Sequence, residues 1–270
     1  MRALEQIIAE IERGEVTFPT HSDVAFRVRL ALDDPDLHLA KAAQIIVAEP
    51  LLAARVVALA NSVVFSRGGP QVADVRTAVS RLGLKFVRAL ATAVVMRQMS
   101  GSIQSPVFQS LAVRLWEHTV HVAALAHLLA VRFRLPSDVA LFAGIVHDVS
   151  GFYLISRSDD HPGLFSDGSL LTAEAEAKVG RAIFAALAVP DEVVGGIESL
   201  WRGGVATFPP HDLGDLLKLS NRLTPMRSPL QRAEPEWPGL ALPPEDEAQL
   251  AEILEQSSDE LDNLTKALRY

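Results

Sequence analysis

The chain has 270 residues, enough for one large helical domain or two small ones with an extensive core. It contains no cysteine, which excludes disulfides and thiolate metal sites. Its formal net charge of −8 argues against a nucleic-acid partner, because negative charge repels the phosphate backbone.

No secretory signal or membrane span is expected. Glu5 lies where a signal peptide would need an apolar core. The uncharged runs 89–96 and 139–146 are shorter than the roughly 18 residues that suggest a span. A cytoplasmic protein is therefore predicted.

Apolar residues recur at spacings of three and four, and alternation with period two is rare, which predicts an all-α fold. In the first part of the chain, helices are expected over residues 3–13, 37–48, 50–61, 72–82 and 84–99, with another that carries Val24, Val28 and Leu32. Residues 18–20 should lead into that helix, and residues 33–36 and 66–70 should form turns, because acids, glycine and proline favour them.

A short linker over residues 100–106 separates two predicted helical lobes, 15–100 and 107–223, which together form one domain. In the second lobe, helices are expected over residues 107–133, 172–187, 190–201 and 213–223, with another that starts near Pro136 and runs into His147. Residues 1–14 form a separate N-terminal helix. The C-terminal segment 224–270 has an irregular part, 225–244, and one closing helix, 245–268.

One group of residues has the composition of a metal site. His118 shares a helix face with apolar residues such as Leu115 and Val122, so it should point inward. His147 shares its face with small residues, which let a neighbouring helix approach, and Asp148 follows it. Two imidazoles and a carboxylate suit iron, manganese or zinc. The alternative is a pair of buried histidines that only make hydrogen bonds.

The other histidines and two tryptophans are assigned structural roles. His121 and His127 are expected at the surface or half-buried on the helix of His118. His21, His38, His161 and His211 fall in or beside turns and are expected to face solvent. Trp116 and Trp201 are predicted to fill the core.

Several ordered blocks resemble the HDOD (HD-related output domain) family. They are residues 18–28, 32–35, 48–56, 59–62, 78–84, 115–118 and 143–149. The similarity covers roughly residues 15–223 and implies a helical fold like that of HD phosphohydrolases. In those enzymes a His, a His-Asp pair and a late Asp bind metal and activate water for phosphoester cleavage. HDOD proteins, in contrast, generally look like signalling outputs or scaffolds.

The sequence departs from the hydrolase pattern at several positions. Asn221 replaces the late metal-binding Asp, and Glu176 occupies the place of a further His. Leu200 and Trp201 stand where paired histidines are frequent, and Ser150 and Gly151 replace a glycine and a lysine. The resemblance thus implies no two-metal site, although His118, His147, Asp148 and Glu176 together can hold one ion.

The preferred hypothesis is a non-catalytic bacterial signal-transduction module. It would act through contacts with signalling proteins or by binding a small ligand at the degenerate site. It would carry no cofactor, or one weakly bound Fe, Mn or Zn ion. The alternative is a metal-dependent phosphohydrolase that acts on a nucleotide or a cyclic dinucleotide. A third possibility is a pure scaffold with a dry, packed site.

Overall fold

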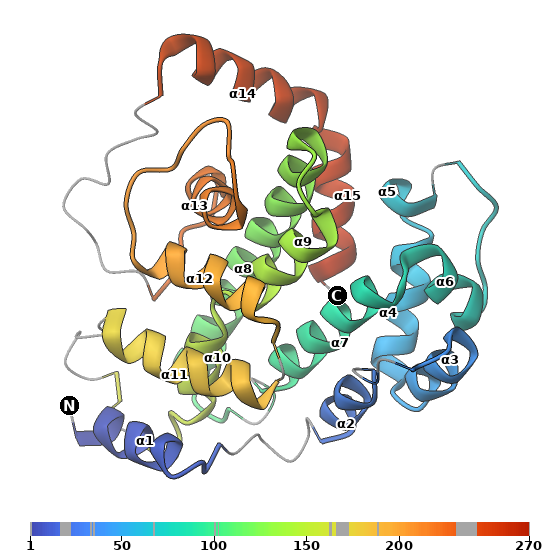
Figure 1. Ribbon diagram of the computed structural model, residues 1–270. Helices are drawn as coiled ribbons and strands as arrows, with labels where there is room; N and C mark the ends of the chain where they lie inside the picture. The colour runs from blue at the N-terminus through green and yellow to red at the C-terminus, as the bar shows by residue number, and fades with distance from the viewer. Residues whose placement is uncertain are drawn as a thin grey trace.

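The computed structural model describes residues 2–16, 23–32, 34, 36–66, 68–99, 101, 103–161, 164–165, 173–187, 189–230 and 242–269. Every regular element in these residues is a helix (Figure 1), which confirms the all-α prediction. In chain order the helices are α1 (Arg2–Glu12), α2 (Asp23–Ala31), α3 (Leu39–Val47), α4 (Pro50–Ala60), α5 (Val63–Ser66), α6 (Val75–Leu82), α7 (Leu84–Met99), α8 (Pro106–Phe133), α9 (Ser137–Val146), α10 (Val149–Ser156), α11 (Ala173–Ala186), α12 (Asp191–Trp201), α13 (Leu213–Leu223), α14 (Pro244–Gln256) and α15 (Ser258–Arg269).

Local signals in the sequence explain where several helices begin and end. Pro50 occupies the first turn of α4, where its missing N–H costs nothing, and the Glu49 carboxylate accepts from the Leu52 N–H at 2.5 Å. The Asp74 side chain caps α6 by accepting from the Thr77 N–H at 2.8 Å. Gly83 ends α6 with a φ of 83°, a conformation that glycine adopts readily.

Three elements differ from the prediction. The short helix α5 lies just before the predicted loop 66–70 and was not expected. The helix that precedes His147 ends at Val146, and a second helix, α10, starts directly after Asp148. The predicted closing helix 245–268 is wrong as a single element, because it is interrupted at Ser257 and forms α14 and α15.

Some predicted segments lie outside the described residues. These are the lead-in 18–20, His21, residues 33 and 35 of the predicted turn, residue 67 of the predicted loop, residues 100 and 102 of the predicted linker, and residues 231–241 of the irregular segment.

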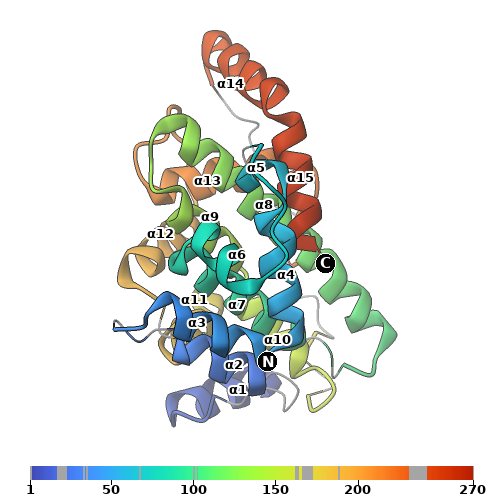
Figure 2. The same cartoon turned by 90° about the vertical axis from the view of Figure 1, so that its right-hand side faces the viewer.

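The long helix α8 lies at the centre of the second half of the chain. It packs against α9, α13 and α15 (Figure 1). The first-half helix α7 packs on α2, α4 and α6, and also on α9 and α10 of the second half. The closing helix α15 lies along α8 and contacts α4 and α5 (Figure 2). The N-terminal helix α1 packs on α11. One continuous apolar core therefore includes side chains from both halves.

The adjoining helices α9 and α10 make a longer apolar stretch than the sequence predicted. Residues Ser137–Ser156 are long and apolar enough to cross a membrane by length and composition alone. However, 83% of the most apolar window is buried inside the molecule, as is typical of a core helix. This helix pair holds His147 and Asp148 at its central bend.

Candidate functional site

His118, His147 and Asp148 converge between α8 and the junction of α9 with α10. One ligand atom from each residue lies within 4.8 Å of the other two. The two Nε2 atoms are 3.3 Å apart, and Asp148 Oδ2 lies 3.3 Å from His147 Nε2 and 3.7 Å from His118 Nε2. All three residues are buried: His118 is 1% exposed, His147 is 2% exposed and Asp148 is 9% exposed. The predicted convergence of the two histidines is therefore present in the structure.

Close contact between α8 and α9 brings the two imidazoles together. A Cβ atom on Gly144 would lie only 2.5 Å from the Ala123 Cα, so only glycine allows the helices to approach this closely. The chain then bends at His147 and Asp148 before α10 begins. This bend places the Asp148 carboxylate beside both imidazoles.

Backbone carbonyls fix the orientation of both rings. His118 Nδ1 lies 2.6 Å from the Met226 carbonyl oxygen, and His147 Nδ1 lies 2.7 Å from that of Gly144. A carbonyl only accepts, so each Nδ1 carries the proton and each neutral ring presents its Nε2 lone pair. Two lone pairs and the Asp148 oxygen therefore face one another, an arrangement that requires a shared proton or a cation.

A proton shared by the cluster would reside on His147. Burial opposes a charge on this ring, but the Asp148 carboxylate, the Gly144 carbonyl and the charge of Glu176 together outweigh burial and raise the pKa of His147. Burial lowers the pKa of His118 more than Asp148 raises it. Burial also works against the charge of Asp148, yet the neighbouring imidazoles hold its pKa below the ordinary value.

The ligand spacing also fits a metal ion. Atoms bound about 2.0–2.2 Å from a tetrahedral ion lie roughly 3.3–3.6 Å from one another. The three separations in the cluster are 3.3, 3.3 and 3.7 Å. In addition, Asp148 Oδ2 is buried, and the nitrogens nearest to it are the Nε2 atoms of the two histidines that would bind the same ion. The chemistry and the spacing of these donors suit one divalent cation.

Glu176 and Asn221 lie outside this group of three. Burial and the charge of Asp148 raise the pKa of Glu176 to about 7. The carboxyl group of Glu176, on α11, therefore lies close enough to the cluster to interact electrostatically with Asp148 and His147. The Asn221 Oδ1 on α13 is buried, with no hydrogen-bond partner in the described part of the chain. Their roles as ligands stay predictions.

The chain that follows α13 covers one side of the cluster, which the sequence did not predict. Its Met226 carbonyl accepts from His118, and the Thr224 hydroxyl lies 3.3 Å from the same carbonyl oxygen. A few residues later the Leu230 side chain occupies the space that a Cβ on Gly151 would need. Gly151 was the available signal, since a glycine inside a helix often marks a close packing contact.

The remaining histidines show one wrong prediction. His127 is fully buried rather than at the surface or half-buried: it is 8% exposed, its ring lies against Phe65 and Phe86, and its Nδ1 donates to the Ser137 carbonyl at 3.0 Å. His121 is half-buried, as predicted, and His38 and His211 are exposed. His161 is half-buried and lies 3.2 Å from an Arg157 nitrogen.

Both tryptophans fill space in the interior, in agreement with the prediction. Trp116 is buried, and its ring packs edge-on against Phe152. Trp201 is half-buried and stacks on Phe184, with 5.6 Å between ring centroids and an interplanar angle of 8°. Gly180 leaves room for the Trp201 ring.

Comparisons with known proteins agree with this fold. The family model of the HDOD domain matches residues 18–189. No curated protein sequence matches the chain significantly.

Three solved structures share the fold at 20% sequence identity. A "putative metal-dependent phosphohydrolase" from Shewanella amazonensis has a TM-score of 0.64, with 100% of this chain and 99% of that chain covered. An HDOD domain protein with unknown function from Geobacter sulfurreducens has a TM-score of 0.62, with 99% and 98% covered. A "putative signal transduction protein" from Marinobacter aquaeolei has a TM-score of 0.59, with 99% and 66% covered.

Proposed function

The chain belongs to the HDOD family, and from this premise we propose that it is a non-catalytic regulatory module of bacterial signal transduction. Its His118, His147 and Asp148 cluster would bind one divalent cation without hydrolysing phosphoesters. The module would act through contacts with other signalling proteins. We place it in the cytoplasm, in keeping with the absence of cysteine.

The burial of the three ligands carries this proposal. A phosphohydrolase needs an accessible metal position, because metal-bound water must reach the phosphorus atom. Here none of the three residues is more than 9% exposed, and the segment around Met226 lies against His118. A phosphoester would have to displace this segment before it could approach the cluster.

The charge of the cluster also supports weak binding of a single cation. A bound cation would neutralise Asp148 and replace the proton on His147, while the Met226 and Gly144 carbonyls keep both imidazoles oriented. Asn221 offers only an amide oxygen at the position where the HD phosphohydrolases that this chain resembles have a carboxylate. Weak binding of one Fe, Mn or Zn ion follows from this loss of charge.

A metal-dependent phosphohydrolase is the second candidate, because the three ligand separations suit a tetrahedral ion. Hydrolysis of a generic phosphodiester, nucleoside phosphates and cyclic dinucleotides with added Mn²⁺, Fe²⁺ or Mg²⁺ distinguishes the two candidates. We expect the wild type to show no more turnover than His147→Ala. Turnover that is clearly present in the wild type and lost in His147→Ala would establish the hydrolase instead.

A further inference from the structure

A buried arginine on α4 carries a positive charge that no neighbouring side chain pairs. Arg55 lies on the helix that packs against α6, α7 and α15 (Figure 2), and it is only 6% exposed. Its Nε and Nη1 atoms are enclosed and have no hydrogen-bond partner among the described residues. Because a buried charge without a partner is costly, this arginine destabilises the fold unless an anion binds to it.

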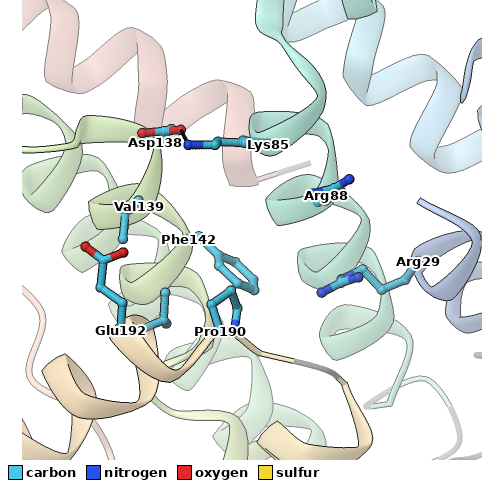
Figure 3. A pocket seen from close by; sticks show the side chains of 9 residues that line it. Arg29, Lys85, Arg88, Asp138, Val139, Phe142, Pro190 and Glu192 are labelled. Atoms are coloured by element: carbon cyan, nitrogen blue, oxygen red, sulfur yellow. Dashed lines mark ion pairs between the residues drawn. The ribbon is translucent and has the colours of Figure 1, made fainter. Parts of the chain in front are cut away.

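Arg29, the other fully buried arginine of the described residues, is held by bonds within the chain. Its Nε donates to Thr92 Oγ1 at 2.7 Å, and its Nη2 donates to the Leu187 carbonyl at 3.1 Å. Figure 3 shows its guanidinium group directed from α2 toward Phe142, beside a cavity of about 190 Å³. Hydrogen bonds therefore account for the burial of Arg29, whereas no such bonds account for the burial of Arg55.

Glu49 does not neutralise Arg55, although its negative charge favours the charged form of that residue. One carboxylate oxygen of Glu49 accepts from the Leu52 N–H in the first turn of α4, and the other lies 3.5 Å from Gln98 Nε2. With both oxygens engaged in this way, Glu49 forms no ion pair with Arg55 within the described residues.

Arg97, in the last turn of α7, adds a second positive charge. It is half-buried, and no hydrogen bond or ion pair joins it to another residue in the described ranges. Burial and the charge of Arg97 lower the pKa of Arg55 to about 10, and the opposing effect of Glu49 is smaller than that of Arg97. Arg55 is therefore charged at neutral pH, and its repulsion from Arg97 exceeds its attraction to the one carboxylate.

Solvent reaches the edge of this pair of arginines. The third guanidinium nitrogen of Arg55, Nη2, is not among the enclosed atoms, and Arg97 and Gln98 are both partly exposed. A planar guanidinium group binds a carboxylate or a phosphate through two nitrogens, and Nη1 and Nη2 of Arg55 have no partner in the described part of the chain. The small exposed fraction of Arg55 limits such a ligand to a compact anionic group.

We propose that Arg55 and Arg97 bind a small oxyanion, the phosphate or carboxylate group of a metabolite, beside the contact of α4 with α7. The anion accepts hydrogen bonds from Arg55, supplies the negative charge that Glu49 does not, and screens Arg55 from Arg97. Charge-assisted hydrogen bonds of this kind are among the strongest in proteins. The site is separate from the histidine cluster and does not depend on cation binding there.

Thermal denaturation of the metal-free chain tests the proposal. Inorganic phosphate and acetate are each compared with chloride at equal ionic strength, and calorimetric titration gives their affinities. At least one of the two anions should raise the Tm of the wild type above its value in chloride, because a ligand that binds only the folded state stabilises that state. The larger response identifies the bound group as a phosphate or a carboxylate.

Variants locate the binding. Arg55→Met replaces the guanidinium group by an apolar side chain, so it should be at least as stable as the wild type in chloride and should lose the response to the anion. Arg97→Gln changes a partly exposed residue, so it should fold normally and weaken binding roughly tenfold. Arg132→Gln, which removes an exposed charge on α8, should leave the affinity unchanged.

Three results would overturn the proposal. The first is a wild-type Tm that responds to phosphate and acetate no more than to chloride. The second is an equal response of the wild type and Arg55→Met, which would indicate the general stabilising effect of such salts on folded proteins. The third is an equal affinity of Arg97→Gln and Arg132→Gln, a comparison that holds even if Arg55→Met does not fold.

Discussion

The two ends of α9 border two different regions, a cavity and the histidine cluster. Toward its N-terminal end, Asp138 and Phe142 line a cavity of about 190 Å³, and the Arg29 guanidinium is directed toward Phe142 from the far wall (Figure 3). At its C-terminal end, the chain continues into His147 and Asp148, where three acceptor atoms meet. One helix thus separates a cavity lined by both basic and acidic side chains from a cluster that requires a proton or a cation.

The two regions also differ in how they meet solvent. The histidine cluster is enclosed, with no residue above 9% exposure. The cavity opens beside Lys85, whose side chain is 75% exposed. This difference means that a ligand of the cluster must pass protein atoms to reach it, whereas the cavity can be reached directly from solvent.

The largest effect is expected from Gly144→Ala, which separates α8 from α9. Its new Cβ would lie 2.5 Å from the Ala123 Cα, and a backbone atom cannot rotate away, so we expect a loss of about 3 kcal/mol or more in the free energy of unfolding. The matched control is Gly195→Ala on α12, where no atom lies within 4 Å of the added Cβ and a gain of up to about 1 kcal/mol is expected. Urea denaturation measures both changes, and equal effects would contradict this packing.

The next largest effect is a pH dependence of the free energy of unfolding, which Glu176 should contribute beside the histidine cluster. Glu176 has a pKa of about 7 in the folded chain and an ordinary value of 4.5, so the folded state binds this proton more tightly than the unfolded state. The resulting stability is present below pH 4.5 and is lost as the pH rises through 7. It amounts to about 3 kcal/mol, at about 1.4 kcal/mol per pKa unit.

Glu176→Gln should therefore remove this part of the pH dependence. Denaturation of the metal-free wild type and variant at several pH values between 5 and 8 measures the difference. An unchanged slope in the variant would show that Glu176 does not lie in the buried, acidic environment described.

A smaller effect compares two buried arginines. Arg29 bonds to Thr92 and to the Leu187 carbonyl, so Arg29→Met should cost about 2 kcal/mol. Arg55 is 6% exposed, and its Nε and Nη1 have no hydrogen-bond partner in the described residues. Burial and the charge of Arg97 lower its pKa to about 10, although the nearby charge of Glu49 acts in the opposite direction.

Arg55→Met should therefore change the free energy of unfolding by less than about 0.5 kcal/mol or increase it, because an unsatisfied buried charge is costly. Thermal or urea denaturation compares the two variants. A larger loss for Arg55→Met than for Arg29→Met would contradict this comparison, because it would show that the surroundings of Arg55 stabilise its charge more than the two bonds of Arg29 stabilise that residue.

The sequence predicted helices where local signals are strong. The bounds of α7, Leu84 to Met99, agree with the prediction because Gly83 ends the preceding helix. The break at Ser257 was missed, because the acidic and apolar pattern continues across it.

The candidate site was predictable in part. The inward faces of His118 and His147 follow from helical periodicity. The burial of His127 does not, since that argument assumes a helix with one exposed face, and α8 is enclosed on nearly all sides near this residue. The bond from His118 to the Met226 carbonyl joins residues 108 positions apart and involves a backbone atom, so no side-chain pattern indicates it.

Titration with Mn²⁺ of the wild type and of Asn221→Asp tests the central claim, that the cluster binds one cation weakly because a carboxylate is missing. We expect weak binding by the wild type and at least tenfold tighter binding by Asn221→Asp, since a full charge replaces a dipole in a partly buried site. Asn263→Asp adds the same charge on α15 and should leave the affinity unchanged. Tight binding by the wild type, or equal affinity of the wild type and Asn221→Asp, would contradict the account.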